Sequence, residues 1–451
     1  MIGKDLYREF LRVIQRKWPQ HSAIIVVTLI SLVSALLLIA PGAIIEIIEN
    51  PSDKTWAAIF LAVITTAILY PIYLSIYVTI KPVVVPRIPR VNVFFPVNDY
   101  NSRGDALLQY AGFEAARAKF NDNIDIRLFD SSKDDWLFDL EQCIYGKDVP
   151  DDSPVWIIVA MSSYGKKARE RIEAYLKKDP RLKERLTAIF TVSSSKFETS
   201  DRRNLFRIFV DGETEVTAIA EYIELNLSPR SNEPLICFRV DSNYGRDAEK
   251  KLFDLFGEKY EIRTCDKNSI EEVDFTGASV VVAIAYDLDL RTLFSKLKSN
   301  GFKGHVFGTT PMSVPDWKKL FDYDPANITV MHTSVSGFDN DPDFQARLAP
   351  INVEYLINRD EELIKGRTAH RLRDDAKEYA AYSSIESNYI SAFCEDCVRL
   401  FELASRKGHP TLYSMLSDPS CDSDRRNLTT LRDLDFGVTG EAHVSVFLRK
   451  A

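Results

Sequence analysis

The chain has 451 residues, a formal net charge of −8, 27% charged residues and six cysteines. This acidic balance, with no concentrated basic stretch, argues against nucleic acid as a partner, because neutralising phosphates requires a basic surface. Six cysteines in so long a chain are too few for a disulfide framework and indicate a reducing compartment.

Two charge-free apolar runs lie near the start of the chain, at residues 22–45 and 55–80. Each exceeds the roughly 20 residues that a helix needs to cross a bilayer. Both are also longer than the apolar region of a signal peptide. Residues 22–80 therefore predict a two-helix transmembrane hairpin, with a pair of buried helices in a soluble core as the alternative. Residues 1–21 predict an amphipathic segment, either on the inner membrane surface or as an extension of the first span.

Charge around these runs predicts the orientation of the chain. Lys and Arg predominate in residues 1–21 and 81–90, whereas the connecting turn carries Glu46, Glu49 and Asp53 against Lys54. Lys/Arg excess marks the cytoplasmic side of a span. We therefore expect a multi-pass protein of the inner (cell) membrane, with the lipid bilayer as a partner and with both the N-terminus and the C-terminal domain in the cytoplasm.

A proline-rich linker at residues 81–90 precedes an alternation of strands and helices. Strands are expected at residues 91–97, 124–130, 155–161, 187–192, 205–210, 234–240, 260–265, 279–286 and 305–310. Helices are expected between them at residues 106–121, 166–178, 214–227, 248–257 and 290–301, and later at 387–408. This order predicts an α/β fold with parallel strands, and the length from residue 91 to residue 451 predicts two Rossmann-like lobes. In such sheets a ligand binds beyond the carboxyl ends of the strands.

Four stretches, in order, resemble the type I periplasmic-binding-protein family, which includes leucine/isoleucine/valine-binding and receptor ligand-binding proteins. They are the opening strand VFFPV, residues 191–223 with the pair Phe206-Arg207, residues 240–256 with the pair Tyr244-Gly245, and the GVTG segment at 437–440. The resemblance implies a clamshell that closes on a small molecule. Its lobe one would comprise residues 91–210 and 338–430, and its lobe two residues 211–333 and 431–451. The three crossings would lie near Asp211, residues 334–337 and residues 431–440.

The resemblance also implies which residues bind the ligand. In lobe one they follow the strands and are Ser162, Ser163, Tyr164, Ser193, Ser194 and Ser195. Asn98, Asp99 and Tyr100, in the turn after the first strand, are further candidates. In lobe two they are Tyr244, Tyr286 and Thr310. Free N–H groups at helix N-termini make such turns receptive to anions, and a tyrosine ring offers a stacking surface for a planar ligand. N-capping is the alternative role of each serine.

One departure from the family concerns the ligand. Amino-acid-binding members place an acidic residue near the position of Thr310, where this chain has Thr-Thr-Pro. An α-amino acid ligand is therefore disfavoured, unless Asp287 or Asp289 replaces that acid. Both aspartates are equally suited to cap the helix that follows, and we favour that role.

Other motifs indicate no catalytic or metal site. Cys394 and Cys397 are spaced as in a redox or metal pair, but they fall within an expected helix without further ligands, which favours packing. The six histidines are scattered along the chain, and no nucleophile elbow, phosphate loop or zinc signature is present. We expect no enzymatic activity, no cofactor and no metal. The charged run at 347–377 predicts a solvated helix, with a homo-oligomer contact as the alternative.

These features favour a cytosolic small-molecule sensor that transmits clamshell closure to a two-helix membrane element, as in membrane effectors of bacterial defence or signalling. The first alternative is a membrane-tethered, extracytoplasmic solute-binding protein of an ABC-type uptake system. The second is a scaffold whose cleft no longer binds a ligand.

Overall fold

The computed structural model divides the chain into two units, Met1–Arg87 and Ile88–Ala451. It describes residues 88–97, 103–147, 149–150, 153–193, 203–227, 233–313, 327–335, 341–359, 373, 389–425, 435–436, 442–443 and 446–450. The expected amphipathic segment, the expected hairpin at 22–80 and most of the linker at 81–90 lie outside these residues. None of the helices described here combines the length and the hydropathy of a membrane span.

The first part of the second unit is built on a five-stranded sheet with the order β2-β1-β3-β4-β5, in which every pairing is parallel. The strands are β1 (Arg90–Phe95), β2 (Asp125–Asp130), β3 (Val155–Ala160), β4 (Leu186–Thr191) and β5 (Leu205–Ile208). The helices between them are α5 (Arg103–Phe120), α6 (Trp136–Tyr145) and α7 (Ser162–Lys178), with a 3-10 turn η2 (Pro180–Glu184). We call this sheet and the helices packed on it lobe one.

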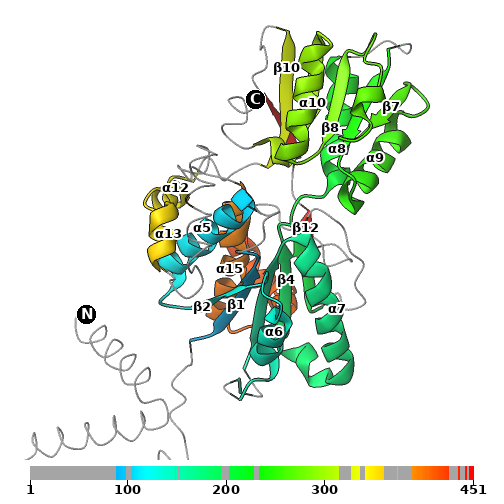
Figure 1. Cartoon of the computed structure of the whole chain (residues 1–451). Helices are drawn as coiled ribbons and strands as arrows, with labels where there is room; N and C mark the ends of the chain where they lie inside the picture. The colour runs from blue at the N-terminus through cyan, green and yellow to red at the C-terminus, as the bar shows by residue number, and fades with distance from the viewer. Residues whose placement is uncertain are drawn as a thin grey trace, which may run out of the picture. The chain divides into compact units, whose positions relative to one another are not determined.

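Successive side chains along the strands of lobe one point to opposite faces of the sheet, so the core of this lobe has two layers. Trp156, Ile158 and Ala160 of β3 pack with α5 and α15 (Tyr389–Lys407), whereas Val155, Ile157 and Val159 pack with α6 and α7. In Figure 1, α5 and α15 lie on one side of these strands, and α6 and α7 lie on the other. Both faces of the sheet are therefore buried, as is typical of a parallel sheet covered by crossover helices.

The second sheet has the order β13-β10-β9-β8-β6-β7. Its strands are β6 (Leu235–Arg239), β7 (Ile262–Cys265), β8 (Val280–Ile284), β9 (Gly304–Gly308), β10 (Ile328–Val335) and β13 (Val446–Lys450), and only the pairing of β10 with β13 is antiparallel. Its helices are α8 (Gly212–Asn226), α9 (Asn243–Phe256) and α10 (Asp287–Ser299), with 3-10 turns η3 (Ile270–Glu272) and η4 (Thr310–Ser313). We call this sheet and its helices lobe two.

The two sheets share one winding. Written in chain order within each lobe, both follow the pattern 2-1-3-4-5, and lobe two adds β13 at the end. In each lobe the winding direction reverses between the first and third strands, β1 and β3 in lobe one and β6 and β8 in lobe two. Ligands of open α/β sheets bind at this reversal, beyond the carboxyl ends of the strands.

A late segment of the chain completes lobe one. Helix α15 packs along α5, and Ser391 Oγ donates a hydrogen bond to the carbonyl of Leu108, 283 residues away in sequence. Gly112 of α5 permits this approach, because a Cβ atom there would lie 2.3 Å from the carbonyl oxygen of Ser391. The remaining elements are α12 (Pro342–Leu348), α13 (Val353–Arg359), α16 (Leu412–Leu416), η7 (Pro419–Cys421), α17 (Asp422–Arg425), β11 (Asp435–Phe436) and β12 (Ala442–His443).

The parallel α/β class and the expected strands and helices from residue 91 onward are confirmed, with two kinds of difference. Helix α7 begins at Ser162, four residues earlier than expected, so the predicted turn at 162–165 is the first turn of a helix. Helix α6 and strand β10 were not expected. The exact lobe boundaries stay predictions.

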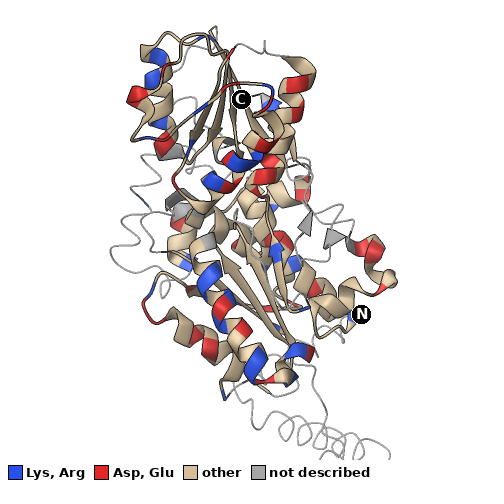
Figure 2. Ribbon diagram, turned by 90° about the vertical axis from the view of Figure 1, so that its right-hand side faces the viewer, with Lys and Arg blue, Asp and Glu red and all other residues tan. Residues whose placement is uncertain are grey.

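The charged run at 347–377 is solvated in part only. Arg347 of α12 forms a short ion pair with Glu395 of α15, whose side chain is completely buried. Lys119 lies 3.5 Å from the same carboxylate, and burial lowers the pKa of this lysine. In Figure 2 most of the residues coloured as Lys, Arg, Asp or Glu lie on helices and loops, whereas most of the strand ribbon is tan.

Candidate functional site

Helix α7 begins directly after β3, at the point where the winding of lobe one reverses. Its N-cap residue, Met161, has φ 75° and ψ 136° and makes no side-chain capping bond. The methionine side chain has no oxygen with which to accept from the first N–H groups of the helix, which have no partner within the helix. The positive φ of a non-glycine residue is strained, and such strain gathers at functional sites. The start of α7 is therefore suited to an anion.

A second strained residue follows the adjacent strand. Val192, directly after β4, has φ 50°, which is a genuine outlier for a β-branched side chain. Strands β3 and β4 are paired in register up to Ala160 and Thr191, so Met161 and Val192 leave the same edge of the sheet side by side. Two strained positions therefore adjoin at the carboxyl edge of lobe one.

The buried side chain of Arg207 holds the turn after β4. Its Nη1 donates to the carbonyls of Ser193 (2.8 Å) and Phe209 (3.3 Å). Nη2 lies 3.5 Å from Asp211, the residue that caps α8. The arginine of the Phe206-Arg207 pair thus ties the turn at Ser193 to the segment where the chain leaves lobe one for lobe two.

Asp130, which sequence reasoning did not single out, organises the turns after β1 and β2. Its buried carboxylate accepts from the backbone N–H groups of Val97 (3.1 Å) and Ser132 (3.0 Å) and from the Ser132 hydroxyl. An aspartate at the end of a strand is common in turns, so the sequence carried no distinctive signal. The bond to Val97 sets the direction in which the chain leaves β1.

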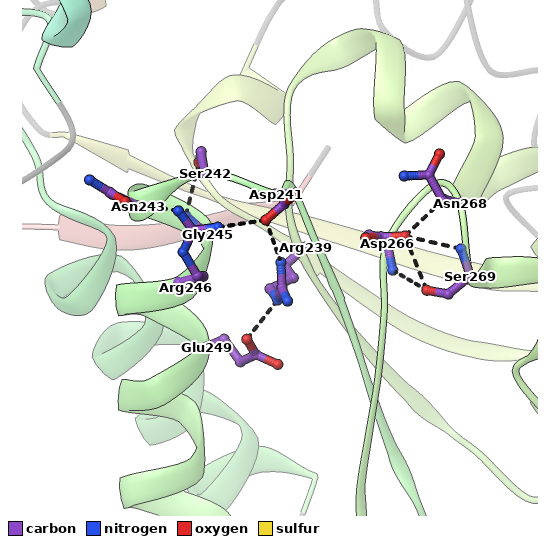
Figure 3. Close-up of polar contacts among 10 residues, drawn as sticks. All are labelled: Arg239, Asp241, Ser242, Asn243, Gly245, Arg246, Glu249, Asp266, Asn268 and Ser269. Atoms are coloured by element: carbon purple, nitrogen blue, oxygen red, sulfur yellow. Dashed lines mark hydrogen bonds and ion pairs between the residues drawn. The ribbon is translucent and has the colours of Figure 1, made fainter.

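In lobe two the turn between β6 and α9 is held by a polar network (Figure 3). Ser242 caps α9 by accepting from Gly245 N–H (3.2 Å), and Asp241 pairs with Arg246 (2.6 Å). Gly245 has to be small, because a Cβ atom would lie 2.0 Å from the carbonyl of Val240. This tight turn presents Tyr244, which explains the Tyr244-Gly245 pair in physical terms.

Two further contacts in Figure 3 support neighbouring strand ends. Arg239, the last residue of β6, pairs with Glu249 of α9 (2.6 Å), which fixes the helix against the strand. After β7, Asp266 accepts from the N–H groups of Asn268 (2.8 Å) and Ser269 (3.0 Å). The turns at the carboxyl ends of β6 and β7 are thus held by side-chain hydrogen bonds and ion pairs.

Glu215 of α8 is the centre of a buried polar cluster in lobe two. Its Oε1 accepts from Thr310 N–H (2.6 Å) and from Thr333 Oγ1 (2.7 Å), and its Oε2 accepts from the Tyr244 hydroxyl (2.9 Å). Burial raises the pKa of the Glu215 carboxyl, although these hydrogen bonds oppose the shift. Burial and the neighbouring Glu215 raise the pKa of Tyr244 well above its usual value. Sequence reasoning missed Glu215.

Tyr286 is the exposed partner of this cluster. It ends the segment after β8, opposite Tyr244 across the reversal of lobe two, and the two rings stack with centroids 6.1 Å apart. Tyr286 keeps 40% of its surface exposed, whereas Tyr244 keeps 3%. A planar ligand placed at this edge would meet the Tyr286 ring first.

The structure places the predicted site residues in three groups. Tyr244 and Thr310 come together around Glu215, and Tyr286 stacks on Tyr244. Ser163 is exposed, Tyr164 is half-buried against Trp136, and Ser193 is buried at the edge of lobe one. Asn98, Asp99, Tyr100, Ser194 and Ser195 lie outside the described residues, and Ser162 is described only by its backbone. All of them stay predictions as ligand contacts.

The aspartates after Tyr286 are not at the N-cap of α10. Tyr286 itself holds that position, and Asp287 and Asp289 lie within the first turn. Asp289 is 3.5 Å from Lys267. Cys394 and Cys397 are buried in α15, with no disulfide, and burial raises the pKa of both thiols, which fits packing.

Comparison with solved structures bears on the fold. A leucine-binding protein of Thermotoga maritima matches with 11% identity and a TM-score of 0.53, covering 81% of this chain and 95% of its own. A periplasmic ligand-binding protein of a branched-chain amino acid ABC transporter from Burkholderia xenovorans matches with 10% identity and a TM-score of 0.55, covering 80% and 90%. The fold is that of type I periplasmic binding proteins.

A third similar structure carries a ligand. A substrate-binding protein from Streptococcus pneumoniae in complex with isoleucine has 11% identity, a TM-score of 0.51, and coverage of 81% of this chain and 100% of its own. No protein-family model and no curated protein matches the sequence. At such low identity the likeness concerns the fold, and these neighbours are solute-binding proteins and not enzymes.

Proposed function

We propose that the chain binds a small planar anion at the carboxyl edges of its two sheets and acts as a membrane-anchored sensor. The uncapped start of α7 behind the strained Met161 is the observation that carries the binding proposal. The anion would accept from the first N–H groups of α7, and its planar part would stack on Tyr286. Ser162, Ser163, Ser193, Ser194, Ser195, Asn98 and Tyr100 would line the same edge.

The chemistry of lobe two argues against an α-amino acid as the ligand. An ammonium group needs an anionic partner, and Glu215 is buried with three donors already bonded to it. Asp289 is 14% exposed and lies beside Lys267. A carboxylate carried on a ring, as in the 4-hydroxybenzoate bound by a similar solute-binding protein from R. palustris, satisfies both lobes better.

Binding is tested by thermal shift and calorimetry on the purified full-length chain with 4-hydroxybenzoate, leucine, isoleucine and nucleotides. A matched pair of variants, Met161→Asp and Met161→Asn, separates charge from capping, because both side chains cap α7 and only Asp adds a negative charge. We expect Met161→Asp to weaken anion binding at least tenfold and Met161→Asn to weaken it less. Affinities in both variants equal to that of the unsubstituted chain would show that the start of α7 does not bind the anion.

The stacking role of Tyr286 is tested with Tyr286→Ala. Tyr355→Ala is the matched control, because Tyr355 is 38% exposed and lies on α13 of lobe one. We expect loss of affinity of about 1 kcal/mol or more for Tyr286→Ala and none for the control. A chain that binds no member of the panel would favour the scaffold interpretation.

The sensor part of the proposal rests on the sequence around residues 22–80. Ligand closure of the lobes would pass through the proline-rich linker at 81–90 to the expected hairpin, whose response would be clustering or opening. Differential affinity of the ligand for the closed state is the energy that drives such a change. Channel or membrane-disrupting activity in proteoliposomes, with and without ligand, is the direct measurement.

The second candidate is a tethered solute-binding protein of an uptake system. It is favoured by the similar solved structures, which include a periplasmic ligand-binding protein and an extracellular ligand-binding receptor. The two candidates differ in the side of the membrane on which Ala451 lies. A C-terminal reporter active only in the cytosol supports the sensor, and a signal only from a periplasmic reporter supports the uptake protein.

A further inference from the structure

Three potential metal ligands converge in lobe one after the end of α15. The imidazole of His409 lies with Nε2 3.2 Å from Asp418 Oδ2 and 3.9 Å from Cys421 Sγ. The three donor atoms all lie within 4.8 Å of one another. Among the residues that the structure describes, no second group of three such side chains gathers in this way.

The geometry distinguishes a metal site from a catalytic triad. In a triad the acid and the nucleophile contact opposite nitrogens of the imidazole, whereas here both face Nε2. Ligands of a tetrahedral zinc ion, with Zn–N near 2.05 Å and Zn–S near 2.3 Å, lie about 3.3 to 3.6 Å apart. The observed separations require side-chain movements of only a few tenths of an ångström for two of the three pairs.

The surroundings hold each ligand in place. Gly408, with φ +78°, ends α15 and turns the chain so that His409 N–H bonds to Ala404 O (2.8 Å). The second oxygen of Asp418 accepts from Ser420 N–H (2.9 Å), which leaves Oδ2 directed at the imidazole and lowers the pKa of the carboxyl. Such outer contacts orient ligands in metal sites. Cys421 is completely buried, whereas 36% of the Asp418 side chain is exposed.

We propose that His409, Asp418 and Cys421 bind a Zn²⁺ ion, with a fourth position open to solvent. A nitrogen, an oxygen and a thiolate sulfur form a ligand set that suits zinc, and one open position is compatible with four-coordination. The ion would join the end of α15 to η7 and so fasten the last helices of lobe one.

This site is separate from the proposed ligand edge. The segment between His409 and Asp418 is attached to the opposite end of the sheet, because Trp156 Nε1 donates to Pro410 O (3.0 Å) and Leu412 N–H donates to Thr187 Oγ1 (3.1 Å). Trp156 and Thr187 are the second residues of β3 and β4. The two proposals can therefore fail independently.

The test is metal titration of the chelator-treated full-length chain with Zn²⁺, using a competing chromophoric chelator, and with Co²⁺. We expect one equivalent of tightly bound metal and a thiolate-to-cobalt charge-transfer band. Cys421→Ser should remove that band, and Cys421→Ser and Asp418→Asn should each weaken Zn²⁺ binding at least tenfold. Added Zn²⁺ should raise the melting temperature of the unsubstituted chain more than that of Cys421→Ser or Asp418→Asn.

Matched controls remove the same groups elsewhere. Cys143→Ser deletes a buried thiol of α6, and Asp424→Asn deletes a carboxylate that pairs with Lys407 (3.0 Å). Both should keep full metal affinity. Asp418→Asn keeps the oxygen that accepts from Ser420, so it tests the site even if Cys421→Ser does not fold. Absence of the band, or unchanged affinity in Asp418→Asn, would show that His409 and Asp418 form a polar contact without a metal.

Discussion

A carboxyl group that burial drives toward its protonated form makes lobe two sensitive to pH. The pKa of Glu215 is raised above its usual value of about 4.5. In such a group the contribution to folding is fully present below the unfolded pKa and is lost as pH rises through the folded pKa. The free energy of unfolding should therefore contain a component that falls as pH increases from about 4.5 toward the raised pKa of Glu215.

Glu215→Gln should remove this pH-dependent component. The amide oxygen can accept from Thr310 and Thr333, and the amide nitrogen can donate to the Tyr244 hydroxyl, so the cluster stays bonded. Urea unfolding at about pH 5 and about pH 8 measures the difference. We expect the variant to gain stability relative to the unsubstituted chain at the higher pH. An identical pH dependence in both chains would contradict a raised pKa.

Glu215→Ala should act in the opposite direction at every pH. It leaves the N–H of Thr310 and the hydroxyls of Thr333 and Tyr244 without their acceptor, at a cost of about 3 kcal/mol or more. Glu221→Gln on the same helix is the control, because Glu221 is exposed and its substitution should change stability by less than about 0.5 kcal/mol.

The sequence did contain a signal that Glu215 is buried, although the family resemblance did not draw attention to this residue. Glu215, Ile219 and Ile223 recur every four residues, so an acid occupies the apolar stripe of α8, where a solvated residue does not belong. Two of its three partners, Thr310 and Thr333, by contrast, lie 95 and 118 residues further along the chain. No local pattern could have named them. The positive φ of Val192 was equally hidden, because a valine at a strand end gives no sign of strain.

At the scale of helices, the close contact of α5 with α15 depends on the absence of a side chain at Gly112. Gly112→Ala would place a Cβ atom 2.3 Å from the Ser391 carbonyl and 2.8 Å from Cys394 Cβ. Helix α5 or α15 would have to shift, at a cost of about 1 to 3 kcal/mol. The midpoint of urea unfolding should fall accordingly.

Gly165→Ala is the matched control for that prediction. Gly165 is also a buried helical glycine, but the nearest atom to its added Cβ would be Phe190 Cδ1 at 3.4 Å, an ordinary contact. The better helix propensity of alanine should then stabilise the chain by up to about 1 kcal/mol. Equal destabilisation by both substitutions would show that the contact of α5 with α15 is not specially close.

Elements were predictable where hydrophobic period and turn residues agreed, as in β3 and the capped helix α9. Strand β10 was missed because its buried residues include His332, Thr333 and Ser334, which do not read as an apolar strand. These polar side chains are acceptable there because Thr333 bonds to Glu215 and His332 lies 3.0 Å from the Thr333 carbonyl. The predicted helix began four residues after the start of α7, because the first turn, Ser-Ser-Tyr-Gly, has the composition of a loop.

Across the whole second unit, the last strand, β13, should stabilise the fold of lobe two. Strand β13 pairs with β10 from Met331 to Val335, and Leu448 packs against the core beneath α8 and α9. Leu448→Asp should place an unpaired charge there and destabilise lobe two by about 2 kcal/mol or more. Limited proteolysis should then cut lobe two before lobe one.

Phe447→Asp separates this effect from a general disturbance of the strand. Phe447 is the neighbour of Leu448 on the other face and is 40% exposed. The variant should resist proteolysis as well as the unsubstituted chain does. If both variants are cut alike, the burial of Leu448 is not what secures the strand.

The packing of α5 on α15 also determines when lobe one can be finished during synthesis. Leu108 and Ser391 are 283 residues apart, and ribosomes add about 5 to 20 residues per second. Roughly 15 to 60 seconds therefore pass between the synthesis of α5 and that of α15, which covers its apolar face. During that interval the nascent chain presents an uncovered hydrophobic surface, which makes it a candidate client for ribosome-associated chaperones.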